Sequence, residues 1–322
     1  MKVIVTGGAG FIGSNYVKQR LQKNEESLSE LLVIDNLTYA GTHENLESVK
    51  SNPKFTFVKG DICDEKLVDE LFNGADEIIH FAAESHVDRS IESSSEFIRT
   101  NVLGTNTLLN ALRKHTSAKF LHVSTDEVYG SIQEGSWTEE FPLAPNSPYS
   151  ASKAASDLLV LSYFKTYGLN VFISRCCNNY GPNQFPEKVI PLFITNIVRG
   201  KKLPVYGDGK NSREWIHVKD HCSALDLILE SGLPGQIYNI GSGAEISNLD
   251  LTKRILQHLN RSEEDIEYVA DRLGHDFRYS LDSTKIESGL GFHPTMTFDK
   301  GLDETIKWYL EHENWWKSKV AN

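Results

Sequence analysis

Tyr149 and Lys153 stand four residues apart in the segment Tyr149-Ser150-Ala151-Ser152-Lys153. Residues at this spacing share one face of a helix, and Pro148, directly before Tyr149, suits a helix start. A free tyrosine titrates near about pH 10, and a neighbouring ammonium group favours the phenolate, which lowers the pKa of the tyrosine. We therefore predict that Tyr149 is a general base for a hydroxyl proton. Taken alone, this spacing is common and usually marks a solvated helix surface.

Two adjacent carboxyl groups, Asp126 and Glu127, follow Thr125 just beyond a run typical of a buried strand, Lys119–Ser124. Ligands of open α/β sheets bind outside the carboxyl ends of the strands. A hydride transfer needs one base, whereas elimination of water needs a base for a carbon-bound proton and an acid for the leaving hydroxyl. A desolvated pocket can separate the pKa values of two such carboxyls. The pattern thus favours elimination; the alternative is that both residues cap the following turn.

A glycine-rich turn opens the chain at Gly8-Ala9-Gly10-Phe11-Ile12-Gly13, with Gly7 directly before it. A strand pattern precedes this turn and a helix pattern follows it, which is the setting in which the glycines let a backbone approach a diphosphate at a helix N-terminus. Asp35 ends the second strand, where a carboxylate bonds the adenosine ribose and repels a 2′-phosphate. The sequence therefore predicts NAD rather than NADP; the alternative is a plain turn and a surface aspartate.

The elements expected to position these residues alternate along the first half of the chain. We predict strands at Lys2–Thr6, Leu31–Asp35, Phe55–Lys59, Glu77–Phe81, Lys119–Ser124 and Asn170–Arg175, and helices at Ile12–Gln22, Lys66–Phe72, Ile98–Lys114 and Ser150–Tyr167. Such alternation implies a parallel, doubly wound Rossmann sheet.

Shorter elements between turn signals follow Arg175 and predict a second, smaller α/β domain that binds the substrate. We expect the division at 1–175 and 176–322, with segments near 215–240, including the strand Gln236–Ile240, returning to the first domain.

The composition excludes several classes of protein. The 322 residues carry a net charge of −11, which argues against nucleic acid as a partner and leaves anionic ligands to a few local basic groups. Four cysteines without a C-x-x-C pair, no signal-like N-terminus and no long apolar stretch predict a cytoplasmic protein that does not enter a membrane. The eleven histidines show no metal-ligand pattern, so we expect no metal. The aromatic tail around Trp308 and Trp315 is expected to pack a helix.

Taken together, the motifs resemble those of the extended short-chain dehydrogenase/reductase superfamily, and within it the dTDP-glucose 4,6-dehydratase family. They run in family order over nearly the whole chain: Thr6–Gly13, His80–Ser90, Ser124–Gly130, Tyr149–Lys153, Arg175–Pro182, Ser212–Asp220 and Asp271–Asp276. The triplet Thr125-Asp126-Glu127 is the most diagnostic, because related 4-epimerases lack the paired acids.

The resemblance implies a reaction and a role for each catalytic residue. Glucose would be oxidised at C4, lose water across C5–C6 and regain hydride at C6, giving dTDP-4-keto-6-deoxyglucose for deoxysugar synthesis of the rhamnose type. Tyr149 would take the 4-hydroxyl proton and Lys153 would hold the nicotinamide ribose. Thr125 would bond the O4 region, Glu127 would remove the C5 proton, and a protonated Asp126 would donate to the C6 hydroxyl. NAD would stay bound through turnover, and the protein would be a homodimer. The alternative is a 4-epimerase or a dehydratase of another, UDP-linked sugar.

The same resemblance implies binding residues. NAD contacts are expected from Gly7, Gly10, Phe11, Ile12, Gly13, Asp35, Asn36, Leu37, Asp61, Ile62, Phe81, Ala82, Ala83, Ser85, Thr100, Tyr149, Lys153 and Asn179. Substrate contacts are expected from Ser85, Thr125, Asn178, Lys188, Val189, Pro204, Val205, Tyr206, Arg213, Asn248, Asp271, Arg272 and His275. The guanidinium forks of Arg213 and Arg272 suit a diphosphate. Leu273 stands where the family has proline.

Overall fold

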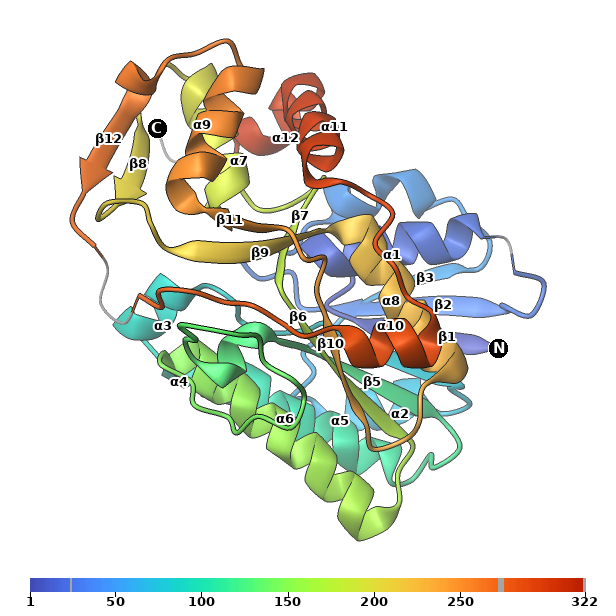
Figure 1. Cartoon of the computed structure of the whole chain (residues 1–322). Helices are drawn as coiled ribbons and strands as arrows, with labels where there is room; N and C mark the ends of the chain where they lie inside the picture. Colours follow the sequence, from blue (N-terminus) through green and yellow to red (C-terminus); the bar gives the residue numbers. More distant parts are fainter. Residues whose placement is uncertain (24, 272–274, 321–322) are drawn as a thin grey trace.

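A seven-stranded parallel sheet forms the centre of the molecule (Figure 1). The computed structural model describes residues 1–23, 25–271 and 275–320. The strand order is β10-β6-β5-β4-β1-β2-β3, with the bounds β1 Lys2–Thr6, β2 Glu30–Asp35, β3 Phe55–Lys59, β4 Glu77–His80, β5 Lys119–Thr125, β6 Val171–Cys176 and β10 Ile237–Ile240. The order reverses beside β1, the point at which open α/β sheets bind ligands. The expected doubly wound fold is confirmed, and the predicted strands match within one residue at each end.

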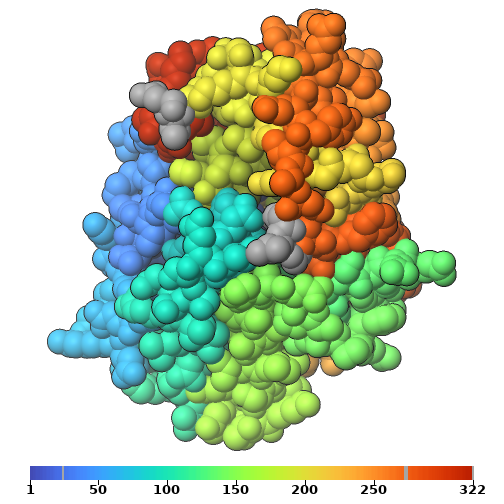
Figure 2. Space-filling view, turned by 90° about the vertical axis from the view of Figure 1, so that its left-hand side faces the viewer, coloured from blue at the N-terminus to red at the C-terminus, as the bar shows by residue number. Residues whose placement is uncertain are grey.

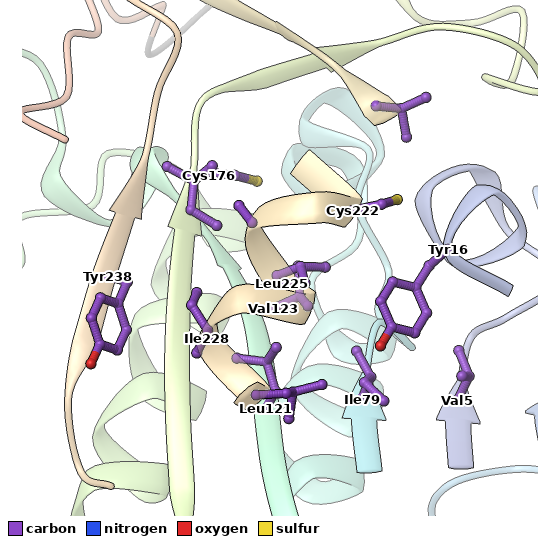
Figure 3. Packing of buried hydrophobic residues seen from close by; sticks show 14 of the residues in the cluster. Val5, Tyr16, Ile79, Leu121, Val123, Cys176, Cys222, Leu225, Ile228 and Tyr238 are labelled. Carbon is purple, nitrogen blue, oxygen red and sulfur yellow. The ribbon is translucent and has the colours of Figure 1, made fainter. Parts of the chain in front are cut away.

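Helices cover both faces of this sheet because neighbouring strand residues alternate between them. Ile4 faces the cluster formed with α2 (Glu65–Phe72), α5 (Thr105–Leu112) and α6 (Pro148–Tyr167). Val3 and Val5 face the opposite cluster, to which α1 (Phe11–Gln22), α8 (Val218–Ser231) and α10 (Thr284–Leu290) contribute. In Figure 3, Leu225 and Ile228 of α8 lie over Leu121 and Val123 of β5, and Tyr16 of α1 lies beside Ile79.

A third apolar cluster lies in the smaller, second part of the molecule. Its helices are α7 (Val189–Val198), α9 (Asn248–His258), α11 (Phe298–Glu311) and α12 (Glu313–Lys317). Two small sheets accompany them, β11-β9-β7 and β12-β8, with the bounds β7 Asn178–Tyr180, β8 Leu203–Tyr206, β9 Ser212–His217, β11 Glu245–Ser247 and β12 Ile266–Val269. Figure 2 shows this part, in yellow and orange, packed directly onto the teal and green segments of the first part.

The predicted helix at 98–114 is two elements of different geometry. Residues Ile98–Gly104 (η2) form a π-helical turn that continues into α5. The Asn101 side chain lies in this turn, where it accepts from the Glu84 backbone N–H at 2.9 Å and donates to the Ser152 hydroxyl at 2.8 Å. Wide turns of this kind occur mostly at functional sites, and this one joins the loop after β4 to helix α6.

The remaining helical segments are short: η1 His43–Val49, α3 Val87–Glu92, α4 Ser95–Phe97, η3 Asp126–Tyr129 and η4 Glu263–Asp265. Within the residues that the structure describes, no helix has the length and apolar character needed to cross a membrane.

Candidate active site

A long cleft runs along the carboxyl ends of the central strands, between them and the second part of the molecule. It has a volume of about 1860 Å³ counted out to its mouth, and residues of both parts line it. The cleft brings together the glycine-rich turn, the residues that follow β2, β4, β5 and β6, and the first turns of α6 and α7. Its lining extends from the glycine-rich turn to the first turn of α7.

The glycine-rich turn forms one end of the cleft, against the N-terminus of α1. Gly7 has a φ of +69°, and a Cβ at this position would lie 2.7 Å from the Ala82 Cα. A Cβ on Gly13 would overlap the Gly7 carbonyl oxygen and lie 2.9 Å from the Gly8 Cα. Only glycine fits both positions, and the exposed first amides of α1 suit a diphosphate.

The Asp35 carboxylate is fixed by the backbone on both sides at the end of β2. One oxygen accepts from the Ala9 N–H at 2.9 Å and the other from the Leu37 N–H at 2.8 Å. Burial raises the pKa of Asp35, although these two bonds oppose the shift. Asp35 lines the cleft, whereas Leu37 does not and packs instead against the apolar cluster around α1.

Asp61 holds a similar position beyond β3, farther along the cleft wall. It accepts from the Cys63 N–H at 2.8 Å and from Arg99 at 2.7 Å. No sequence motif points to Arg99, which lines the cleft from the π-helical turn.

Helix α6 presents Tyr149 and Lys153 to the centre of the cleft. Ser147 and Ser150 cap the helix reciprocally, with Pro148 in its first turn, which explains why it begins here. Both side chains are buried. The Lys153 ammonium donates to the Val123 carbonyl at 2.8 Å, and burial lowers its pKa to about 8.

The electrostatics around Tyr149 differ from the sequence-based prediction. Burial first, and then the charges of Glu127 and Asp126, raise the pKa of Tyr149 well above its ordinary value. The expectation that the neighbouring ammonium group brings this pKa below its ordinary value is wrong for the protein by itself, because burial and nearby anionic groups raise the pKa.

Asp126 and Glu127 form the short helix η3 directly after β5, and both line the cleft. Thr125 connects them, since its hydroxyl donates to Asp126 at 3.1 Å and accepts from the Glu127 N–H at 3.3 Å. Asp126 is 1% exposed, and burial together with the Glu127 charge raises its pKa well above the ordinary value. Burial therefore favours the protonated form of Asp126, which lies beside a second, half-buried carboxyl group. This pair can supply an acid and a base.

The structure places the other expected residues in two groups. The cleft is lined by Gly7, Gly10, Phe11, Ile12, Gly13, Asn36, Asp61, Ile62, Phe81, Ala82, Ala83, Ser85, Thr100, Asn178, Asn179, Lys188 and Val189. Seven expected substrate contacts lie in the second part, outside that lining: Pro204, Val205, Tyr206, Arg213, Asn248, Asp271 and His275. Arg272 and Leu273 fall outside the described residues.

The residues of the second group are held in place by their neighbours. The Arg213 guanidinium donates to the carbonyls of Ser212 and Asp276 at 2.7 and 2.8 Å and lies 4.1 Å from the centre of the Tyr279 ring. His275 contacts Asp271 at 2.6 Å and meets the Tyr206 ring edge to face.

Several lining residues were missed by the sequence reasoning. Tyr39 follows β2 and Cys176 ends β6, so their places at strand ends were a usable signal. Phe185 and Glu187 lie in the loop before α7 and gave none. Among the described residues, no group of three or more His, Cys, Asp or Glu side chains is arranged to hold a metal ion.

Comparison with known proteins identifies the family. The family model described as GDP-mannose 4,6 dehydratase matches residues 4–305 of this chain. The chain belongs to the extended short-chain dehydrogenase/reductase family of epimerases and dehydratases. The resemblance noted from the motifs is thereby confirmed.

Two family members named dTDP-glucose 4,6-dehydratase are similar to this chain over nearly its whole length. A dTDP-glucose 4,6-dehydratase of Streptomyces niveus is 52% identical over 319 residues, which cover 98% of this chain and 95% of that protein. The crystal structure of DesIV, a dTDP-glucose 4,6-dehydratase from Streptomyces venezuelae with NAD and TYD bound, has a TM-score of 0.98 and 53% identity, covering 99% of this chain and all of that one.

A family member with a different reaction shares the fold as well. UDP-glucose 4-epimerase from Thermotoga maritima has a TM-score of 0.89 at 30% identity, covering 97% of this chain and 99% of that one. The fold therefore does not choose between the reactions, and the side chains in the cleft must.

Proposed function

We propose that this protein catalyses the NAD-dependent dehydration of dTDP-glucose to dTDP-4-keto-6-deoxyglucose. The observation that carries the proposal is the buried carboxyl group of Asp126 beside Glu127, in the same cleft as Tyr149 and Lys153. Burial favours the protonated form of Asp126. A 4-epimerase has no use for this second acid–base pair. The relatives named dTDP-glucose 4,6-dehydratase support the choice of reaction and of nucleotide sugar.

The cleft fits NAD at the end formed by the glycine-rich turn. The missing side chains of Gly7 and Gly13 leave room for a diphosphate at the first amides of α1, and Asp35 disfavours a 2′-phosphate at the ribose. Bound NAD brings a positive charge that favours the Tyr149 phenolate, accepts the C4 hydrogen as hydride and returns hydride to C6.

Tyr149 and Lys153 serve the oxidation step. Tyr149 takes the proton of the sugar 4-hydroxyl, and the Lys153 ammonium holds the nicotinamide ribose and stabilises the phenolate. Thr125 holds the O4 region, and its hydrogen bonds to Asp126 and to the Glu127 backbone support this role.

Asp126 and Glu127 serve the elimination. The 4-ketone acidifies the C5 proton, which the Glu127 carboxylate removes. The protonated Asp126 donates its proton to the departing C6 hydroxyl, so one water leaves. When hydride returns to C6, Glu127 gives its proton back to C5. The proton that Asp126 lost is made up by the proton that Tyr149 took from the 4-hydroxyl. Each positioned acid or base contributes about a hundred- to ten-thousand-fold in rate.

Incubation with dTDP-glucose and NMR of the product test the proposal. We expect a 4-keto sugar with a methyl group at C6. A product that keeps its 6-hydroxyl, such as a C4 epimer, would contradict it. A parallel incubation with UDP-glucose measures the preference for thymine, to which the second-part residues around Arg213 contribute in this proposal.

We further propose that two copies associate through the outer face of helices α3 and α6 and the turn η2. Four large apolar side chains are exposed there: Ile91, Ile98, Leu103 and Leu158. Such a face suits a second copy of the same chain. Light scattering should give twice the mass of 36.2 kDa, and Leu158→Glu should reduce it to the monomer mass. A monomer mass for the unaltered protein would contradict the proposal.

The domain division at residue 175 and the cytoplasmic location are also proposals. The separate apolar cluster around α7, α9 and α11 supports a second domain. The four free cysteines support a reducing compartment.

A further inference from the structure

A third ionisable side chain follows Tyr149 and Lys153 on the same face of α6. Asp157 lies one helical turn beyond Lys153, and its side chain is completely buried. None of the steps above uses it. Burying a carboxylate is costly unless it is paired, so its partners show what it does.

The partners of Asp157 come from the two strands that end at the active site. Arg175 of β6 donates its Nε–H to one carboxylate oxygen at 2.9 Å. The Nε2 atom of His122, on β5, lies 3.4 Å from the other oxygen. Three residues beyond His122, Thr125 begins the triplet with Asp126 and Glu127, and Arg175 directly precedes Cys176, which lines the cleft. Asp157 thus joins the helix of the oxidation pair to the strand of the elimination pair.

Arg175 is itself held from a third direction. Its Nη1 donates to the Tyr129 hydroxyl at 2.8 Å, and its guanidinium lies 4.7 Å from the centre of the Tyr129 ring. Tyr129 ends the helix η3 that Asp126 begins, and its hydroxyl donates to Asn239 on β10 at 2.9 Å. The network therefore holds the Tyr129 end of η3 against β6 and β10.

Some of the ionisable groups around Asp157 are neutral near pH 7 and others are charged. Burial lowers the pKa of His122 to about 4 and also lowers that of His80, whose ring lies 5.2 Å from the His122 ring, so both are neutral near pH 7. Burial raises the pKa of the Cys176 thiol to about 12, so it is neutral too. Arg175 and Lys153 remain as the cations. Burial opposes the ionisation of Asp157, but the His122 contact and the Arg175 charge outweigh it and lower its pKa.

Lys153 needs a counter-charge because it is buried with its ammonium group on a neutral carbonyl, that of Val123. Burial lowers its pKa to about 8, and the Asp157 charge is the largest influence in the opposite direction. Tyr149 needs the charged form of Lys153, since a neutral amine cannot stabilise a phenolate.

We propose that Asp157 is a positioning residue for the oxidation step: it anchors α6 to β5 and β6, and its negative charge keeps Lys153 in the ammonium form. The inference rests on the proposed function only in its choice of substrate, because any reaction that starts by oxidising a sugar at C4 depends on the same pair.

The test measures the oxidation step alone, in the Glu127→Gln background, where elimination is blocked and reduced nicotinamide accumulates with dTDP-glucose. The rate of oxidation is recorded against pH for the protein with Asp157 and for the variant Asp157→Asn. Asparagine keeps the shape of the side chain and an acceptor oxygen for Arg175. A nearby opposite charge shifts a pKa by about one unit or more. We expect the alkaline limb of the profile to move about one unit towards acid, with about tenfold slower oxidation on that limb.

A matched control exists in Asp226, another buried aspartate paired with an arginine but away from the cleft. Arg20 donates to it at 3.1 Å, and neither residue lines the cleft. Asp226→Asn should lower folding stability but leave the pH profile of oxidation unchanged, because Asp226 has only a structural role.

Three outcomes decide the inference. If Asp157→Asn fails to fold because Arg175 loses its counter-charge, the double variant Asp157→Asn, Arg175→Gln removes both charges and should show the same acid shift. An unshifted profile in whichever variant folds overturns the inference, as does a shift of equal size in Asp226→Asn. If the unaltered protein reduces its cofactor with dTDP-glucose but forms no 4-keto-6-deoxy product, the proposed function fails while the Asp157 comparison stands.

Discussion

Trp315 donates its indole N–H to the Asn45 side chain at 2.9 Å, across 270 positions of the chain. Asn45 is 1% exposed, and its amide donates in turn to the Ala9 carbonyl at 2.8 Å, inside the glycine-rich turn. The C-terminal helix α12 therefore supports the turn that we expect to hold the NAD diphosphate. The aromatic tail does pack a helix, and it also reaches the cofactor end of the cleft.

Trp315→Phe should weaken NAD binding because it keeps the ring but removes the N–H. A net hydrogen-bond contribution of about 1 kcal/mol corresponds to about fivefold in the dissociation constant. Titration of the cofactor-free protein with NAD measures this dissociation constant. Trp308→Phe is the control, since Trp308 is equally half-buried and contacts Tyr309 and Trp315 rather than Asn45. Equal losses of affinity in both variants would count against this role.

Asp126→Asn and Glu127→Gln should each abolish dehydration while leaving oxidation at C4. The protonated Asp126 is the acid and Glu127 the base, so each variant removes one proton transfer, worth about a hundred- to ten-thousand-fold in rate. Loss of product methyl signal together with accumulation of reduced nicotinamide is the expected result. Full dehydration by both variants would show that the acid and base lie elsewhere.

Gly13→Ala should prevent NAD binding, because the added Cβ overlaps the Gly7 carbonyl and deforms the turn. Overpacking of this kind costs about 1–3 kcal/mol of stability. Gly289→Ala is the control: it lies in α10 with no atom within 4 Å of the added Cβ, and it should raise stability by up to about 1 kcal/mol. Thermal unfolding measures the change in stability, and titration with NAD measures the change in affinity. If Gly13→Ala binds NAD as tightly as the unaltered protein, the assignment of the turn is refuted.

His221 should make the protein less stable in acid. Burial lowers its pKa to about 3, whereas a histidine in an unfolded chain titrates near about 6.5. Between these values the unfolded state binds a proton that the folded state does not, so the free energy of unfolding falls as pH falls, by about 1.4 kcal/mol per unit.

His221→Asn should remove that part of the pH dependence. Urea unfolding of both proteins between pH 6 and 4 should show a shallower slope for the variant, by about 1.4 kcal/mol per unit. Above pH 7.5 residue 221 is neutral in the folded and the unfolded state of both proteins. The two plots of unfolding free energy against pH should therefore be parallel there, even though the variant loses the bond to Asn179. Identical slopes below pH 6 would contradict the prediction.

Local sequence patterns were enough for the elements of the main sheet. The run Lys2–Thr6, the glycines up to Gly13 and the pair Tyr149 and Lys153 are read from neighbours a few residues away, and the structure has a strand, a turn and a helix there. The same alternation with right-handed crossovers predicted a doubly wound sheet, whereas the order of its strands comes from the structure.

The tertiary structure decided how these groups behave. How far the pKa of Asp126 rises, whether the pKa of Tyr149 lies above or below its ordinary value, and what pairs with Asp157 all depend on burial and on charges from distant segments, which no local pattern contains. The support of the glycine-rich turn by Trp315 is of the same kind. The sequence by itself determined the fold and the identity of the chemical groups; the packing of distant segments determined their charge states, because desolvation depends on everything that surrounds a group in space.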